Sequence, residues 1–226
     1  CVVLASRSGT PAASAAAEWA QLLQLPTEVR VARCDAAEPS GARWLITQAQ
    51  AGLPPLRGVY HAAGVLADGL PPSQTSQALR HVYAPKAVAA TWLQLATSTA
   101  PLRAFLLFSS TSALLGAAAQ PNYSAANTSL DTLAACRRSS AFVAAAVQWG
   151  PWAEVGMASG GAVRERLQEQ GFGLVGLARG LEAMQTALRA SAPAVLAVMP
   201  VSWSRFLGGV EAPAFLSAFA QSAPSS

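Results

Sequence analysis

The chain has 226 residues, of which 52% are hydrophobic and only 12% are charged. This hydrophobicity excludes a disordered chain, and no clean apolar stretch reaches the length of a transmembrane helix. The formal net charge is +4, but the arginines are scattered, and we interpret the adjacent Arg137 and Arg138 as a solvated helix end instead of a nucleic-acid-binding patch. Lys86 is the single lysine among the basic residues.

The cysteines and the N-terminus bear on the cellular context. Cys1, Cys34 and Cys136 have no CxxC spacing and are odd in number, so we expect free intracellular thiols. The sequence opens inside an apolar run, without Met and without a signal-peptide pattern. We therefore expect part of a longer cytoplasmic chain.

Apolar runs of strand length alternate with stretches of helical composition. The predicted strands cover residues 2–6, 28–33, 57–61, 104–108, 143–149 and 195–200. The predicted helices cover residues 14–25, 41–51, 74–97, 122–139 and 177–190. Strands apolar on both faces and separated by helices predict an α/β fold, a Rossmann-like doubly wound parallel sheet. We expect one domain at 1–207 and a C-terminal tail or linker at 208–226.

Such sheets bind ligands beyond the carboxyl ends of their strands. The residues that follow the predicted strands are therefore the candidates for a functional site. They are Ser6-Arg7-Ser8-Gly9, Cys34-Asp35, His61-Ala62-Ala63-Gly64, Ser109-Ser110-Thr111-Ser112 and Gly150-Pro151-Trp152. A further helix is predicted to begin at Gln120-Pro121-Asn122-Tyr123 and to continue through Asn127.

Several of these segments together resemble one known family. They are SRSG, CDAA, YHAAGVLADG, FLLFSSTSALLG, QPNYSAAN and QWGPWAEVGMA. The sequence resembles the ketoreductase domains of modular polyketide synthases, and of fatty acid synthases, within the short-chain dehydrogenase/reductases. Lys86 precedes Ser110 by 24 residues, Ser110 precedes Tyr123 by 13, and Asn127 follows Tyr123 by four. The YxxxN pattern with an upstream lysine matches synthase domains, whereas free-standing enzymes carry YxxxK.

The resemblance implies NADPH-dependent reduction of a β-ketoacyl thioester, delivered on the phosphopantetheine arm of an acyl carrier protein among other synthase domains. Reducing a ketone leaves negative charge on oxygen, which then needs a proton. Tyr123 would supply it as general acid, and Ser110 would hydrogen-bond the carbonyl oxygen. Lys86 would lower the pKa of the Tyr123 phenol, and Asn127 would assist from the same helix face.

The resemblance also assigns a cofactor site and no metal. Its residues are Arg7, Ser8, Asp35, His61, Ala62, Ala63, Gly64, Pro151 and Trp152. Arg7 suits a 2′-phosphate, which favours NADPH over NADH. The family's first strand and glycine-rich pyrophosphate loop would precede Val2, and they are not in this sequence. We therefore expect weak or no NADPH binding by the chain as it stands.

The resemblance extends to stereochemistry. Leu66-Ala67-Asp68 stands where ketoreductases that form D-configured alcohols carry Leu-Asp-Asp, and its final Asp is the informative one. Leu115 replaces the Trp of the opposite class, and Ala125 stands where a Pro would be. These residues predict a D-hydroxy product without epimerisation.

A second glycine motif, Gly171 to Gly176, satisfies GxGxxG but follows a charged helical stretch instead of a strand. We interpret it as a helix C-cap and turn, after an active-site lid near residues 156–170. Two alternatives to an active synthase ketoreductase remain open. One is a truncated, non-catalytic ketoreductase with a structural role, and the other is a free-standing short-chain alcohol dehydrogenase.

Overall fold

The computed structural model describes residues 1–154, 161–208 and 212–220. The strands are β1 (Val2–Ser6), β2 (Val29–Arg33), β3 (Gly58–His61), β4 (Ala104–Ser110), β5 (Ala145–Trp149) and β6 (Val195–Val198). β1 pairs with β2, and a four-stranded sheet runs in the order β3-β4-β5-β6. Every one of these pairs is parallel. In the described part of the chain no ladder joins the two sheets.

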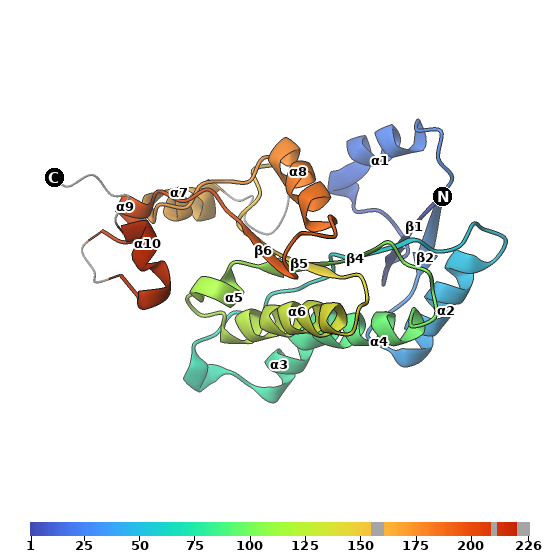
Figure 1. The fold of residues 1–226 in the computed structure, drawn as a ribbon, viewed down its shortest axis with the longest axis horizontal. Coiled ribbons are helices and arrows are strands. Elements are labelled where there is room, and N and C mark those ends of the chain that lie inside the picture. The colour runs from blue at the N-terminus through green and yellow to red at the C-terminus, as the bar shows by residue number, and fades with distance from the viewer. Residues whose placement is uncertain (155–160, 209–211, 221–226) are drawn as a thin grey trace.

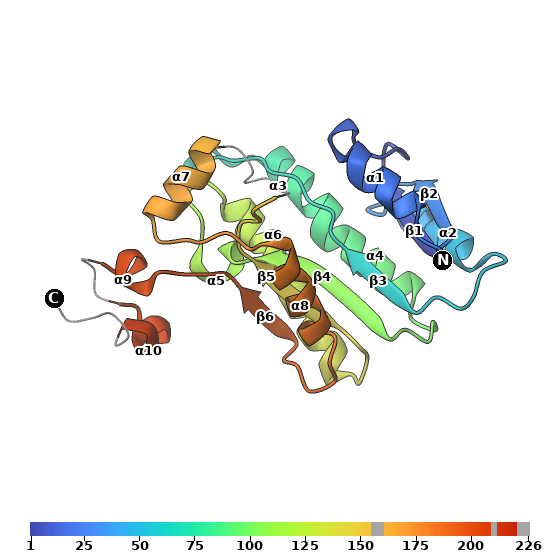
Figure 2. The ribbon, with the colours of Figure 1, turned by 90° about the horizontal axis from the view of Figure 1, so that it is seen from above.

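Helices lie on both sides of the four-stranded sheet, with α4 and α6 on one face and α8 on the other (Figures 1 and 2). The predicted doubly wound α/β fold is therefore confirmed. The α-helices are α1 (Ala16–Leu23), α2 (Pro39–Gln50), α3 (Ser76–Tyr83), α4 (Ala89–Ala96), α5 (Ser112–Leu115), α6 (Pro121–Ser139), α7 (Gly161–Glu169), α8 (Leu177–Ala187), α9 (Trp203–Phe206) and α10 (Ser217–Ala220). Single turns of other helix types are η1 (Ala13–Ala15), η2 (Pro71–Ser73), η3 (Ala84–Val88) and η4 (Ala214–Leu216).

Strand β4 forms the centre of the core, since it pairs with β3 on one side and β5 on the other. Its side chains alternate between the two faces. Phe105 and Leu107 pack with Leu130 of α6, whereas Leu106 packs with Val147 of β5 towards the α8 side. All five side chains are fully buried. Full burial of each contributes roughly 1.5–3 kcal/mol, which fixes α6 against the sheet.

The predicted helix at 74–97 is interrupted, and in this respect the prediction is wrong. A π-helical turn, η3, separates α3 from α4. Pro85 lies in this turn and has no N–H to donate, and the Ala89 N–H reaches back five residues to the Ala84 carbonyl. A π-turn of this kind shifts the helix face, and Lys86 lies in it as a buried residue.

Arg137 and Arg138 are not the solvated pair that the sequence suggested. Arg137 is only 6% exposed, its guanidinium lies 4.1 Å from the ring centroid of Phe105, and its Nε donates to the Val143 carbonyl. Arg138 donates to the Ala190 carbonyl at 3.1 Å. Both side chains therefore connect the end of α6 to neighbouring segments.

The GxGxxG segment caps a helix, as predicted. Gly171 has a φ of 88°, which glycine adopts without strain. Its N–H donates to the Gln168 carbonyl at 3.0 Å, and the Phe172 N–H donates to the Leu167 carbonyl at 2.9 Å. These two bonds form a Schellman motif at the end of α7.

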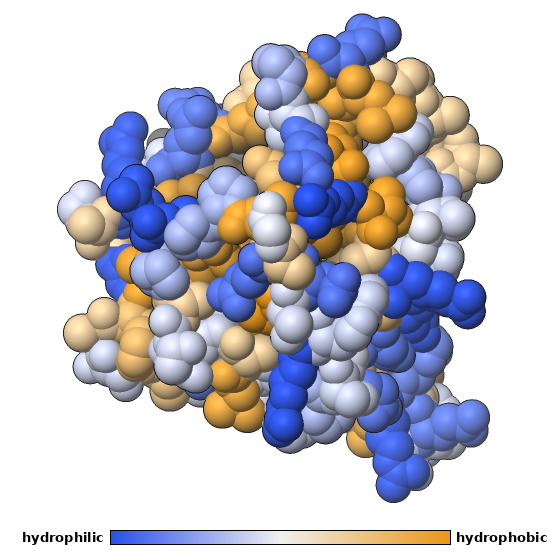
Figure 3. Space-filling view, turned by 90° about the vertical axis from the view of Figure 1, so that its right-hand side faces the viewer, coloured by the Kyte–Doolittle hydropathy of each residue, from blue (hydrophilic) through white to orange (hydrophobic). Residues whose placement is uncertain are grey.

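The segment after α9 includes η4 and α10, and Phe219 stacks on Trp203 with ring centroids 4.2 Å apart. The division of the chain at 207/208 stays a prediction, and residues 209–211 and 221–226 of the expected tail lie outside the described residues. On the opposite side of the molecule, apolar side chains gather on the surface that includes β1 and β2 (Figure 3). Val2, Leu4 and Val31 of these strands are exposed.

Candidate active site

Four predicted catalytic residues come together at the carboxyl end of β4. Tyr123 lies in the first turn of α6 and is 8% exposed, and the side chains of Asn127 and Ser110 lie close enough to its hydroxyl to influence its pKa. Lys86 of η3 is 3% exposed, and its Nζ lies 5.1 Å from the Tyr123 ring centroid. Ser110 is the last residue of β4. The four residues, which span positions 86 to 127 of the sequence, therefore lie close together in the fold.

The start of α6 fixes Tyr123. Pro121 occupies the first turn, where its missing N–H costs nothing. The Asn122 side chain accepts the Tyr123 N–H at 2.7 Å and donates to the Ala67 carbonyl at 2.8 Å. One turn later, Asn127 Nδ2 donates to the Tyr123 carbonyl at 2.9 Å. The tyrosine backbone is thus held from both sides.

The pKa of Tyr123 differs from the expectation. Burial raises the pKa of the phenol, and hydrogen bonds from Asn127 and Ser110 only oppose that rise. The Lys86 ammonium lies over the Tyr123 ring and donates to the Phe108 carbonyl at 3.0 Å. Tyr123 is therefore a protonated phenol at neutral pH.

The pKa of Lys86 is also shifted. Burial lowers its pKa to about 8, and the negative charge of Asp131 opposes this. Gly64 makes room for the side chain, because a Cβ at position 64 would lie 2.9 Å from the Lys86 Cε and 3.4 Å from the Nζ. The backbone at Gly64 therefore lies against the Lys86 side chain.

His61 ends β3 and is buried beneath the lysine. Its Nε2 lies 2.9 Å from the Lys86 carbonyl, so this nitrogen carries the hydrogen and donates. Burial lowers the pKa of His61 to about 4, and the charge of Lys86 lowers it further against the opposing backbone hydrogen bonds. The imidazole is neutral at physiological pH. Ala62 and Ala63, which follow it, are exposed.

The predicted stereocontrol segment is attached to the start of α6. Gln120 Nε2 donates to both carboxylate oxygens of Asp68, at 3.1 and 3.3 Å, and the Gly69 N–H donates to the Ala119 carbonyl at 2.7 Å. Leu66 packs against the cluster that contains Tyr123. Leu115, at the end of α5, is half-buried.

Arg7, Ser8 and Asp35 follow β1 and β2, away from the four-stranded sheet, and all three are exposed. Ser8 Oγ donates to the Thr10 carbonyl at 3.0 Å, and Asp35 Oδ1 accepts the Ala37 N–H at 2.9 Å. These local bonds shape the two turns and leave the Arg7 guanidinium open to solvent. The structure does not bring these residues to Tyr123.

Pro151 and Trp152 follow β5 and are half-buried. The Pro151 carbonyl accepts the Val175 N–H at 2.8 Å, and the Trp152 ring packs on that of Trp149 with centroids 4.8 Å apart. Both residues therefore hold the segment after β5 in place through these contacts. Residues 155–160, where the expected lid begins, lie outside the described residues.

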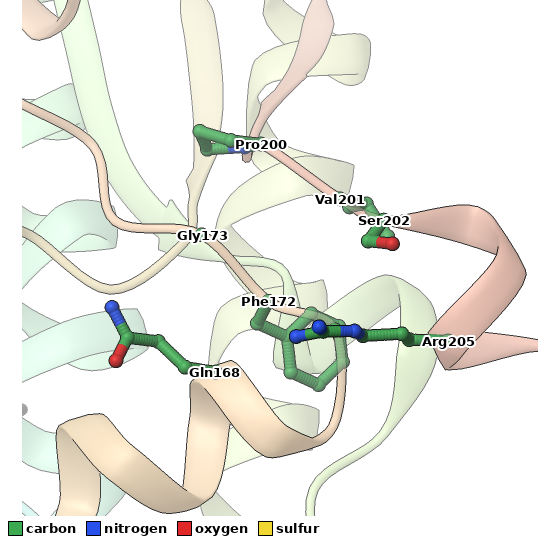
Figure 4. Close-up of a pocket in the computed structure, with 8 residues that line it drawn as sticks. Gln168, Phe172, Gly173, Pro200, Val201, Ser202 and Arg205 are labelled. Atoms are coloured by element: carbon green, nitrogen blue, oxygen red, sulfur yellow. The ribbon is translucent and has the colours of Figure 1, made fainter.

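A surface groove of about 470 Å³ lies between the end of α7 and α9 (Figure 4). Gln168, Phe172 and Arg205 contribute side chains to it, together with the backbone of Gly173 and Pro200. None of the predicted site residues lines it. The groove is thus separate from the Tyr123 group.

Asp131 was not among the residues predicted from the sequence; it lies two turns after Tyr123 on α6 and is buried. The signal was an acidic residue four positions after Asn127, on the same helix face. Among the described residues no three His, Cys, Asp or Glu side chains gather as metal ligands would. In the same part of the chain no helix is long and apolar enough to cross a membrane.

Comparisons with known proteins show the family of this chain. Residues 1–154 match the family described as KR domain. The chain is 41% identical over 220 residues to polyketide synthase GfsA of Streptomyces halstedii, covering 96% of this chain and 3% of that protein. It is 38% identical over 205 residues to the pikromycin polyketide synthase component PikAII of Streptomyces venezuelae, covering 87% and 5%. An A-type ketoreductase structure from a modular polyketide synthase has a TM-score of 0.87 at 38% identity, covering 99% of this chain and 48% of that one.

The parallel sheet with helices on both faces defines a Rossmann-like α/β fold, and Ser110, Tyr123 and Lys86 lie together at the carboxyl end of β4. The chain belongs to the KR domain family, the ketoreductase domains of modular polyketide synthases. It spans 3% to 5% of the length of the curated relatives named above and about half of the solved ketoreductase chain.

Proposed function

We propose that this chain forms the reduction site of a polyketide synthase ketoreductase, which converts a β-ketoacyl thioester into the D-β-hydroxyacyl thioester with NADPH. The observation that carries the proposal is the grouping of Tyr123, Ser110 and Lys86 at the carboxyl end of β4. This edge of a parallel sheet is where such folds bind ligands. Family membership supports the reaction class.

The residues present fit a reduced nicotinamide cofactor at two places. Ala62 and Ala63 are small and exposed after β3, so the backbone beside Lys86 is accessible, and Gly64 has no space for a side chain. Arg7 is an exposed guanidinium at the end of β1, suited to a 2′-phosphate. When bound, NADPH supplies the hydride that reduces the carbonyl carbon.

The side chains of this chain handle the carbonyl oxygen and the proton. Ser110 Oγ donates a hydrogen bond to that oxygen and orients the ketone. Tyr123 Oη gives its proton to the oxygen as negative charge develops, and the product is the alcohol. The raised pKa of Tyr123 keeps the phenol protonated before each turnover. Lys86 supplies positive charge beside the ring while the phenolate waits for a proton from solvent.

The substrate and its partners follow from the family. The thioester would arrive on the phosphopantetheine arm of an acyl carrier protein, beside other domains of the synthase. The D configuration is proposed because Asp68, the informative residue, is retained and lies fixed to the start of α6 by Gln120. Leu66 packs on the Tyr123 cluster from the same segment, so this loop borders the space where the ketone must lie.

The test is NADPH oxidation by the chain with a β-ketoacyl thioester surrogate, followed by absorbance, with chiral chromatography of the product. Tyr123→Phe removes only the acidic hydroxyl, and we expect a loss of about 10²- to 10⁴-fold in kcat. Tyr60→Phe is the matched control, because Tyr60 is exposed on β3 and is expected to leave the rate unchanged. Equal rates for Tyr123→Phe and the wild type would contradict the assignment of the acid.

The same assay separates the alternatives. A folded chain that binds NADPH but oxidises none with any thioester would favour the non-catalytic, structural role. Rapid oxidation of simple secondary alcohols with NADP⁺, without turnover of the thioester, would favour a free-standing alcohol dehydrogenase. An L-configured product would overturn the stereochemical part alone.

A further inference from the structure

The segment 66–69 and the start of helix α6 are joined by several contacts, although they lie far apart in the sequence. Gln120 Nε2 donates to both oxygens of the Asp68 carboxylate, and the Gly69 N–H donates to the Ala119 carbonyl at 2.7 Å. The contact between Gln120 and Asp68 is exposed, so water competes for both side chains. The buried part of this junction is therefore the more informative one.

Asn122 forms the buried part of the junction, and it is 1% exposed. Its Nδ2 donates to the Ala67 carbonyl at 2.8 Å, and its Oδ1 accepts the Tyr123 N–H at 2.7 Å. A carbonyl only accepts and an N–H only donates, so these two partners fix the orientation of the amide. One side chain thus connects the backbone of segment 66–69 to the backbone of Tyr123.

Apolar packing holds the same segment against the same tyrosine. Leu66 and Ala67 pack on a cluster formed by Tyr123, Val82 and Ala126. Val82 belongs to α3 and Ala126 to α6, and both are fully buried. Because closely packed interiors transmit displacements, a shift of this segment would change the surroundings of the Tyr123 ring.

The backbone at Ala119 shows that the junction is held against a local preference. Ala119 has a φ of 60°, a left-handed conformation that is uncommon for residues with a Cβ. In this conformation its carbonyl accepts the Gly69 N–H. Such positions persist where the surrounding structure restrains them, and they gather at functional sites. The neighbouring contacts at Gly69 and Asn122 supply that restraint.

We propose that Asn122 is a positioning residue that determines the configuration of the product. It holds segment 66–69 at a fixed place beside Tyr123, so that the ketone binds in one orientation when its oxygen meets the phenol hydroxyl. Asn122 acts through these two neighbours and is not itself a catalytic residue. Its effect on the product rests on the proposed function, whereas the coupling between the two segments does not.

Asn122→Asp separates the two hydrogen bonds of this side chain. A carboxylate keeps an acceptor for the Tyr123 N–H, at a helix N-terminus where negative charge is favourable, so the start of α6 should be retained. It has no hydrogen to donate to the Ala67 carbonyl, so the link to segment 66–69 is lost. Thr132→Asp is the matched control, because it places the same charge on an exposed position of α6.

Amide hydrogen exchange of the full chain measures the coupling. The Gly69 N–H should exchange about tenfold faster in Asn122→Asp, since loss of a buried hydrogen bond favours local opening. The Leu107 N–H, on the central strand β4, should keep its protection, whereas a purely structural role would accelerate both amides alike. Unchanged exchange at Gly69 in folded Asn122→Asp would overturn the coupling.

Chiral chromatography of the product reads the role in specificity. With a β-ketoacyl thioester surrogate, the ratio of the two product configurations should fall about tenfold in Asn122→Asp and stay unchanged in Thr132→Asp. Faster exchange at Gly69 with an unchanged product ratio would overturn the role in specificity. An inactive wild type would count against the proposed function and the specificity that rests on it, while exchange at Gly69 would still decide the coupling.

Asn122→Ala covers the case in which a buried carboxylate prevents folding. It removes both hydrogen bonds of the side chain without burying a charge, and the same two results are expected from it. Failure of both variants to fold would overturn the positioning role, because Asn122 would then serve the stability of the whole fold.

Discussion

Acid should destabilise the chain through His61. His61 is buried and donates from Nε2 to the Lys86 carbonyl. Its pKa is lowered from 6.5 to about 4. At about 1.36 kcal/mol per pKa unit, this depression corresponds to about 3 kcal/mol of free energy of unfolding.

The sign follows from proton linkage. The unfolded chain binds a proton at His61 below about pH 6.5, whereas the folded chain resists it until about pH 4. The contribution is therefore fully present above pH 6.5 and is lost as the pH falls through 4. Protonation would also add a second positive charge beside Lys86.

Urea unfolding measured from pH 7 to pH 4 checks this prediction. His61→Gln keeps an amide donor for the Lys86 carbonyl but has no titratable ring, so its stability should fall with pH less steeply than that of the wild type. His81→Gln is the matched control, because His81 is the only other histidine and is exposed on α3. Parallel pH profiles for the wild type and His61→Gln would refute the reasoning.

Two packing contacts give further predictions. In Gly180→Ala the new Cβ would lie 2.2 Å from the Trp152 ring, so we expect the free energy of unfolding to fall by about 1–3 kcal/mol. In Gly176→Ala the new Cβ would meet only Glu154 Oε1, at an ordinary contact distance of 3.8 Å, so this variant should change the stability little. Equal Tm values for the two variants would contradict the contact at Gly180. In Arg137→Ala the guanidinium is lost from the face of Phe105, and a Tm decrease corresponding to about 2 kcal/mol is expected; an unchanged Tm would show that the buried cation adds nothing.

The sequence predicted the sheet and the grouping of Ser110, Tyr123 and Lys86 for a common reason. The strands are continuous apolar runs, and burial on both faces leaves few other arrangements for segments such as the one around Leu106. Ser110, Tyr123 and Lys86 stand at the sequence spacing that the resemblance associates with catalysis. Parallel strands bring their carboxyl ends to one edge of the sheet. The grouping of these residues could therefore be predicted from their order along the chain.

The features that the sequence did not reveal depend on contacts between distant segments. The burial of Arg137 requires the ring of Phe105 on β4, and the burial of Asp131 requires the amide of Gln148 on β5. The π-turn at Lys86 needs Pro85 together with a sheet to pack against. Local composition favours a continuous helix or a solvated charge in each case, and tertiary packing overrides it.

The burial of Lys86 has a practical consequence. Because it is the only lysine and is almost inaccessible, amine-directed reagents meet no lysine side chain on the surface of the folded chain. Acylation at position 86 therefore requires the site to open. Its rate, read by mass spectrometry of one peptide, would report how often η3 separates from β4, and a bound ligand that closes the site would slow it.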